Sequence, residues 1–168
     1  QLARPGAPAI PVAEIDEWLY GTDMPATTPP IPRGVFDAVD RAAADWRAGR
    51  LATADLPVRD WVPQEWVRFL DGQPADLGNE RMAQLRTQFR LGADGNAEIA
   101  RSWLALVVRS AYEPAYPDLE RYLLAQMPGF AGPLTVEQFK GGQSNPTYML
   151  VTPGARYVMR SKPGPASK

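Results

Sequence analysis

The 168-residue sequence contains neither cysteine nor histidine. Without cysteine there can be no disulfide, no thiolate nucleophile and no zinc–sulfur site. Without histidine, Ser-His-Asp and Cys-His catalysis and the His-Glu-x-x-His zinc motif are also excluded. Any catalysis would have to use carboxylates, Lys, Tyr, Ser or Thr, or a cation bound by oxygen alone. The first expectation is therefore a chain with no active site of its own and a fold that needs no metal.

The sequence also lacks a large net charge and long apolar runs. Eighteen basic residues stand against nineteen acidic ones, which gives a net charge of −1 and favours neither nucleic acid nor an anionic membrane as partner. No run approaches the roughly 20 apolar residues of a membrane-spanning helix, and no signal-peptide pattern is visible. We expect a soluble, cytoplasmic protein of bacterial type. Its first residue is Gln1 rather than methionine, which leaves processing or truncation open.

Proline is abundant at the start of the chain. A regular helix of any length is not expected over residues 1–33, because each proline removes a backbone donor. The sequence predicts an extended, surface-hugging arm with one apolar anchor, Trp18-Leu19-Tyr20. The prolines of this arm are Pro5, Pro8, Pro11, Pro25, Pro29, Pro30 and Pro32.

Helical periodicity follows over residues 34–128. Five amphipathic segments have their own start and stop signals, and the short connections between them predict antiparallel or steeply crossing helices. We therefore predict an all-α fold of stacked helix pairs. The first segment runs from Phe36 to Gly49, the second from Pro63 to Gly72, the third from its cap Asn79 to Gly92, the fourth from its cap Asn96 to Glu113, and the fifth from Pro117 to Gly129.

The pattern changes to β-type over residues 129–168. Segments 134–140, 147–152 and 155–160 are rich in Val, Thr and aromatic residues, and Pro153-Gly154 predicts a turn with positive φ at the glycine. A small hairpin or ribbon is marginal in water, so it should pack on the helices or pair with another chain through an open edge. The expected anchors are Phe139, Tyr148 and Tyr157.

Several motifs resemble the C-terminal helical domain of leukotriene A hydrolase-type zinc aminopeptidases. The most specific is the run from Asn96 to Leu106, and others occur in the same order over about residues 15–126. The resemblance implies a short right-handed superhelix of paired helices, armadillo/HEAT-like, which in the whole enzyme walls a substrate cleft beside a separate zinc domain. The other motifs are Glu17-Trp18-Leu19-Tyr20, Met24-Pro25, Trp46, Trp66-Val67-Arg68-Phe69-Leu70, Arg81-Met82 and Phe89.

The chain departs from this family at the functional positions. The zinc ligands and the catalytic glutamate belong to a domain that has no counterpart here. The family's basic Gly-Arg-Met-Lys-Phe-like segment is replaced by Ala125-Gln126-Met127-Pro128-Gly129-Phe130. No substrate-binding residue is therefore transferred.

Residues 131–162 resemble the N-terminal start of aminoglycoside-phosphotransferase-like kinases, particularly those joined to acyl-CoA dehydrogenases. In such kinases a glycine-rich loop between the first two strands covers nucleotide phosphates. The resemblance places Gly141, Gly142, Ser144 and Asn145 in that loop. The sequence has no catalytic aspartate after it, so we expect a vestigial loop without kinase activity. The two resemblances together suggest two gene fragments read as one chain.

Asp94, Asn96 and Glu98 alternate like the first ligands of a calcium-binding loop, which would offer oxygen to a hard cation. Ile99 and Ala105 stand where such a loop needs glycine and glutamate. A turn followed by a helix cap is the competing interpretation, and we favour it.

Three functions are consistent with these patterns. The leading one is an isolated aminopeptidase-type helical domain that acts as an accessory or interaction module with no cofactor, binds a protein partner and is no zinc aminopeptidase or kinase by itself. The alternative is a small hydrolase of esters or lactones that uses carboxylates and a divalent cation such as calcium. The third is a nucleotide-binding remnant in the β segment, which could also self-associate through its β edge.

Overall fold

The computed structural model describes residues 11–22, 34–92, 94–139 and 146–160. The chain divides into two compact units, residues 1–35 and residues 36–168. The division predicted from sequence, with separate helical (34–128) and β (129–168) parts, falls inside the second unit. Each unit is described by itself below.

The described residues of the first unit include one helix, α1 (Val12–Tyr20). The prediction of an extended arm is therefore wrong for these residues. Pro11 precedes the helix and no proline lies within it, so nine residues can close their own backbone hydrogen bonds. Trp18, Leu19 and Tyr20 do not act as a buried anchor either, since Tyr20 is 80% exposed and the other two side chains are also exposed.

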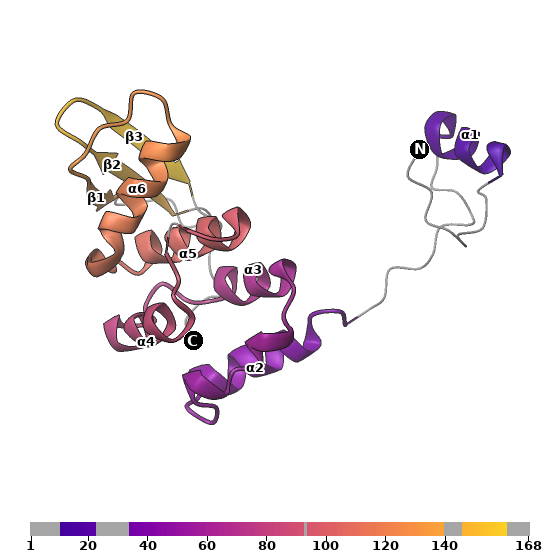
Figure 1. Cartoon of the computed structure of the whole chain (residues 1–168), viewed down its shortest axis with the longest axis horizontal. Helices are drawn as coiled ribbons and strands as arrows, with labels where there is room; N and C mark the ends of the chain where they lie inside the picture. The colour runs from indigo at the N-terminus through magenta and orange to yellow at the C-terminus, as the bar shows by residue number, and fades with distance from the viewer. Residues whose placement is uncertain (1–10, 23–33, 93, 140–145, 161–168) are drawn as a thin grey trace. The chain divides into compact units, whose positions relative to one another are not determined.

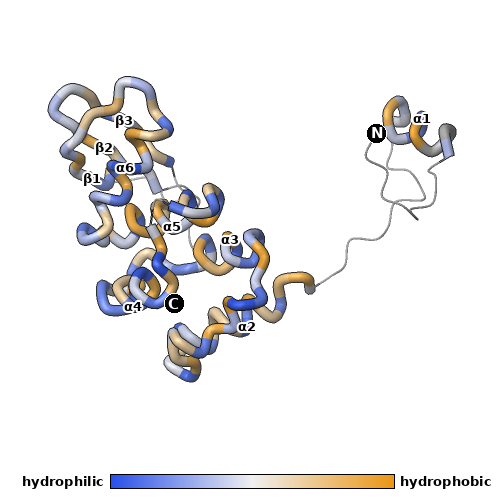
Figure 2. The backbone as a smooth tube through the Cα atoms, in the orientation of Figure 1, coloured by the Kyte–Doolittle hydropathy of each residue, from blue (hydrophilic) through white to orange (hydrophobic). Residues whose placement is uncertain are grey.

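The second unit is mainly helical (Figure 1). The prediction of an all-helical domain followed by a small β ribbon is confirmed. In Figure 2 the tube of this unit changes between orange and blue along its helices, as amphipathic helices do. Among the described residues no helix has the length and apolar character needed to cross a bilayer. The helices are α2 (Asp37–Arg47), α3 (Pro63–Asp71), α4 (Asn79–Phe89), α5 (Ala97–Arg109) and α6 (Tyr116–Gln126), and the short 3-10 segments are η1 (Thr53–Asp55), η2 (Val58–Asp60) and η3 (Glu113–Ala115).

Local signals account for most helix ends. The Glu65 carboxylate accepts the Val62 N–H at 2.8 Å and so satisfies a free donor at the start of α3. The prediction that Asn79 caps α4 is wrong: Asn79 is the first helical residue, and Gly78 precedes it with a φ of 84°. Only glycine adopts that backbone conformation without strain, so the entry into α4 is set by glycine.

The helical core is built around α5. Trp103 is completely inaccessible, and Leu106, Val107 and Phe69 are buried with it. Aromatic rings extend this core outward: Trp66 packs edge-on against Phe89 with ring centroids 5.3 Å apart. Such contacts contribute about 0.5–1.5 kcal/mol each beyond the area that they bury.

The three predicted strands form one antiparallel sheet in the order β1-β2-β3. The strands are β1 (Thr135–Gln138), β2 (Thr147–Val151) and β3 (Arg156–Arg160). A tight turn at Pro153-Gly154 joins β2 to β3, as predicted, but Gly154 does not have positive φ. Instead, the Thr152 hydroxyl bonds across the turn to the backbone of Ala155 at 3.2 Å.

One face of the sheet packs on the helices. Leu150 of β2 and Tyr157 of β3 line one groove with side chains of α5 and α6. Tyr148 and Leu150 are buried on that face, and the Tyr157 ring lies 5.6 Å from the ring of Phe130. The anchors Tyr148 and Tyr157 are thus confirmed, whereas Phe139 is 45% exposed and is no anchor. It lies just beyond the end of β1, where no helix covers it.

Candidate functional sites

Asn96 is the N-cap of α5. Its Oδ1 accepts the N–H of Glu98 at 2.9 Å and that of Ile99 at 3.2 Å. These two bonds satisfy donors that the first turn of a helix leaves free. The helix-cap interpretation of this residue is confirmed, and the side-chain oxygen that would have bound a cation already accepts two hydrogen bonds.

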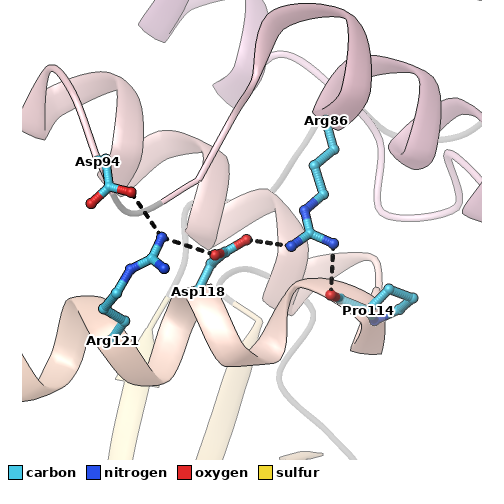
Figure 3. A network of polar contacts seen from close by, with 5 residues as sticks. All are labelled: Arg86, Asp94, Pro114, Asp118 and Arg121. Atoms are coloured by element: carbon cyan, nitrogen blue, oxygen red, sulfur yellow. Dashed lines mark hydrogen bonds and ion pairs between the residues drawn. The ribbon is translucent and has the colours of Figure 1, made fainter.

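Asp94 contributes to a network of polar side chains (Figure 3). Its Oδ2 accepts a hydrogen bond from Arg121 at 2.9 Å. Arg121 also donates to Asp118 at 3.1 Å, and Asp118 accepts from Arg86 at 2.7 Å on its other oxygen. Arg86 continues to the carbonyl of Pro114 at 2.8 Å. The network therefore ties α4 to α6 and to the loop before α5.

Asp94 and Asn96 thus have other partners, since Arg121 bonds to Asp94 and Asn96 caps α5. Glu98 is exposed and lines a separate hollow with Arg101 and Arg68. Over the described ranges, no three His, Cys, Asp or Glu side chains converge as a metal site requires. The predicted phosphate loop, Gly141, Gly142, Ser144 and Asn145, lies outside the described residues.

An elongated groove of about 780 Å³ lies between α5, α6 and β3. Its floor is apolar, with Leu104 from α5 and Leu119 and Leu123 from α6. Arginine side chains also line the groove, and Arg101 and Arg109 come from α5. Arg156 and Arg160 stand at the two ends of β3, and Asp71 is the acidic residue among the lining residues. The groove has the size and the mainly apolar lining of a binding site, with an excess of positive charge.

Arg109 is the most buried of these arginines, with 7% of its surface exposed. Its guanidinium donates to the carbonyl oxygens of Leu70 at 3.1 Å and Gln73 at 3.4 Å, which caps the end of α3. Burial lowers its pKa, and the Asp71 carboxylate opposes that shift. Its Nε is buried and has no hydrogen-bond partner in the described structure. Burial also raises the pKa of the neighbouring Tyr148, so Tyr148 stays neutral and Arg109 stays charged near neutral pH.

Sequence reasoning missed this groove. Arg101 and Arg109 share a helix face, and Arg156 and Arg160 alternate on one strand, so each pair was visible separately. Their convergence was not, because α5 and β3 are about 50 residues apart in the chain.

The helical part of the second unit has the class of fold expected for an aminopeptidase accessory domain. Residues 61–128 match the family model described as leukotriene A4 hydrolase, C-terminal. The match begins just before α3 and ends just after α6. It covers less than half of the chain, and it supports the first of the two resemblances seen in the sequence.

Three curated relatives each match a short stretch of the chain. Acyl-CoA dehydrogenase family member 11 of Gallus gallus is 54% identical over 50 residues, and the proteins of that name from Rattus norvegicus and Mus musculus are 47% identical over 50 residues. In each case the match covers 27% of this chain and 6% of the relative. The chain thus spans a small fraction of the length of these relatives.

Proposed function

We propose that this protein is a non-catalytic accessory module whose helical domain presents a binding surface to a protein partner. The observation that carries this proposal is the family match over α3–α6, because the resemblance seen in the sequence implies a helical domain that walls a cleft beside a separate zinc domain. Fold similarity alone does not establish function. The residue chemistry adds support, since the sequence has no histidine or cysteine.

The alternative of a small carboxylate hydrolase receives no comparable support. It would require Asp94 and Glu98 to bind a hard cation together. Asp94 is ion-paired with Arg121, and Asn96 caps α5. We therefore favour the accessory module over hydrolysis of esters or lactones.

The resemblance of residues 131–162 to a kinase start is a separate proposal. The matched relatives are named for acyl-CoA dehydrogenases, the proteins to which the resembling kinases are joined. Their names do not mention a kinase. We propose a vestigial segment in a cytoplasmic protein, and magnesium-dependent ATP binding by the full chain would contradict the vestigial assignment.

Activity assays with metal analysis test the main proposal. The purified chain is incubated with peptide, ester and lactone substrates with and without calcium or zinc, and its metal content is measured after dialysis. We expect no turnover above the uncatalysed rate and no stoichiometric metal. Turnover that follows the protein through purification and is lost in Asp94→Ala would support the hydrolase instead.

A further inference from the structure

β3 forms one edge of the sheet and also one wall of the arginine-lined groove. In the described part of the chain its only neighbouring strand is β2. All five residues from Arg156 to Arg160 line the groove. Successive side chains of a strand point to opposite faces, so a groove that touches every residue runs along the edge of the strand and not over one face.

The backbone groups that face this groove follow from the hydrogen-bond pattern. Thr152 N–H donates to Ala155 O at 2.9 Å, and Phe139 N–H donates to Thr147 O at 3.0 Å. Hydrogen-bonded and non-bonded pairs alternate in an antiparallel ladder. Both bonds therefore require residues 148, 150 and 152 of the central strand to bond toward β3. It follows that the N–H and C=O groups of Arg156, Val158 and Arg160 point away from β2, toward the groove.

We propose that the β3 edge binds an extended acidic and apolar segment of a partner protein, which adds to the sheet as a fourth, antiparallel strand. This inference rests on the interaction-module proposal and names its partner class. Strand addition obtains affinity from backbone hydrogen bonds and specificity from alternate side chains. Both elements are present here: three outward-facing backbone pairs and two chemically distinct side-chain rows.

The side chains on the exposed face of β3, the outer row, determine every second residue of the partner strand. Arg156, Val158 and Arg160 point to the face of the sheet that the helices do not cover, and Val158 is 65% exposed. Residues directly opposite in an added strand would lie about 5.5 Å away at hydrogen-bonded positions. An acidic, an apolar and an acidic residue complement this row.

The inner row and the groove floor determine the other half. Tyr157 and Met159 point to the helix side, where Leu104 and Leu123 form an apolar floor. Two large apolar side chains, placed between the three outer ones, would cover that floor. The complementary core is therefore Glu-Leu-Val-Leu-Glu, which reads the same in both directions and spans about 17 Å as a strand.

Charge argues against a second copy of this chain as the occupant. Antiparallel pairing of two β3 strands about Val158 would place Arg156 of each copy opposite Arg160 of the other. Like charges directly opposite in a ladder are destabilising, and charged side chains protect open edges from self-pairing. The same two arginines favour an acidic strand.

Binding of a labelled peptide containing this Glu-Leu-Val-Leu-Glu core to the full chain is measured by fluorescence anisotropy. In an antiparallel addition the central valine N–H bonds to β3, whereas the leucine N–H groups point outward. We expect N-methylation of the valine to weaken binding more than about tenfold and N-methylation of one leucine to leave it within about twofold. If N-methylation weakens binding equally at the valine and at the leucine, or at neither, strand addition is overturned.

A charge swap tests the arginine row. R156E/R160E should weaken binding of the acidic peptide by about tenfold or more. The same variant should gain binding to a second peptide, in which the core is Lys-Leu-Val-Leu-Lys. The matched control is R41E/R59E, which changes the same charge at exposed arginines outside the groove. Loss of binding in the control as well would overturn the site, because only net charge would then matter.

The results of these experiments distinguish a failure of the β3 binding site from a failure of the non-catalytic module. Absence of binding by the acidic peptide overturns the β3 site and leaves the non-catalytic module untouched, whereas catalytic turnover by the same preparation overturns the module. A dimer of the full chain in analytical ultracentrifugation that the acidic peptide does not dissociate would assign the edge to a second copy and overturn the acidic partner.

Discussion

In the helices of the second unit, side chains such as Trp103 are enclosed on all sides, whereas the sheet is covered on one face only. Tyr148 and Leu150 are buried against α5 and α6, while Val158 on the opposite face is largely exposed. The helices contain their own core, but the three strands depend on the helices for theirs, as expected for so small a sheet. The difference suggests that the helical part provides stability and that the sheet provides an open edge for recognition.

The largest expected effect is at the centre of the helical core. Trp103→Ala should reduce the free energy of unfolding by about 3–5 kcal/mol, because a large side chain is removed from complete burial. Urea denaturation followed by circular dichroism measures the change. Trp18→Ala, at an exposed tryptophan of α1, is the control and should stay within about 0.5 kcal/mol. Similar effects of the two changes would contradict the core assignment.

A smaller loss is expected in the sheet. Leu150→Ala removes a buried side chain beside the groove and should cost about 2–3 kcal/mol, near the lower end of the range for such truncations, because an edge sheet can relax. Val158→Ala, on the exposed face, should change stability by less than about 0.5 kcal/mol. If Leu150→Ala lowers the free energy of unfolding as much as Trp103→Ala, the sheet is a full part of the core. The difference between the helical part and the sheet would then not hold.

The contact of α5 with the end of α3, inside the helical region, can be tested at Arg109. Arg109→Met keeps the length of the side chain but leaves the carbonyls of Leu70 and Gln73 without their donor. The expected cost is about 1–3 kcal/mol in thermal unfolding. Arg101→Met, at an exposed arginine on the same helix face, is the matched control and should be close to neutral. If Arg109→Met leaves the stability unchanged, water replaces the guanidinium as the donor to these two carbonyls.

Asp118 tests the polar network that joins α4 to α6. Asp118→Asn keeps the shape of the side chain but removes the charge that Arg86 and Arg121 share. A loss of about 1–2 kcal/mol is expected, because hydrogen bonds to charged groups exceed neutral ones. Asp94→Asn, at the exposed end of the network, should cost less than about half as much. The reverse order would mean that the network is held by its exposed ion pair.

The smallest effect is expected at the surface of α2. The hydrogen bond from Arg68 holds the pKa of Asp40 below its ordinary value. A lowered pKa in the folded state means that the contribution is present above the unfolded value of 3.8 and is lost as pH falls through the lower, folded value. Because the pair is exposed, Asp40→Asn should cost less than about 1 kcal/mol and only at low salt. Unfolding at pH 7 and at pH values below 3.8 measures the difference, which should shrink as the pH falls.

Most of the fold could be predicted because its signals are local. Asn96 caps the start of α5 with its own side chain, and the strand pattern predicted three strands that the structure contains. The prediction failed for α1, because averaging prolines over 33 residues hid a stretch without any. It also failed for Phe139, whose burial depends on which helix lies nearby and not on its own sequence neighbours.

The candidate sites were harder to predict because they also depend on residues that are distant in the sequence. The alternation of Asp94, Asn96 and Glu98 occurs in cation loops as well as before capped helices, and the partner of Asp94, Arg121, is distant in sequence. The groove depends entirely on tertiary packing. Alternation and helix-face patterns identify which arginines share a surface of one element, but only the docking of β3 beside α5 brings both pairs together.

The attachment of the sheet through α6 has a consequence for amide exchange. Glu120 accepts the N–H of Leu134, and Phe130 packs on Tyr157. Besides the one face that packs on the helices, these two contacts join the sheet to α6 and to the loop that follows it. Regions with few such connections open on their own, at lower free energy than global unfolding. Amides of β2 and β3 should therefore exchange with deuterium earlier than those of α5, and a bound strand should slow the sheet amides selectively.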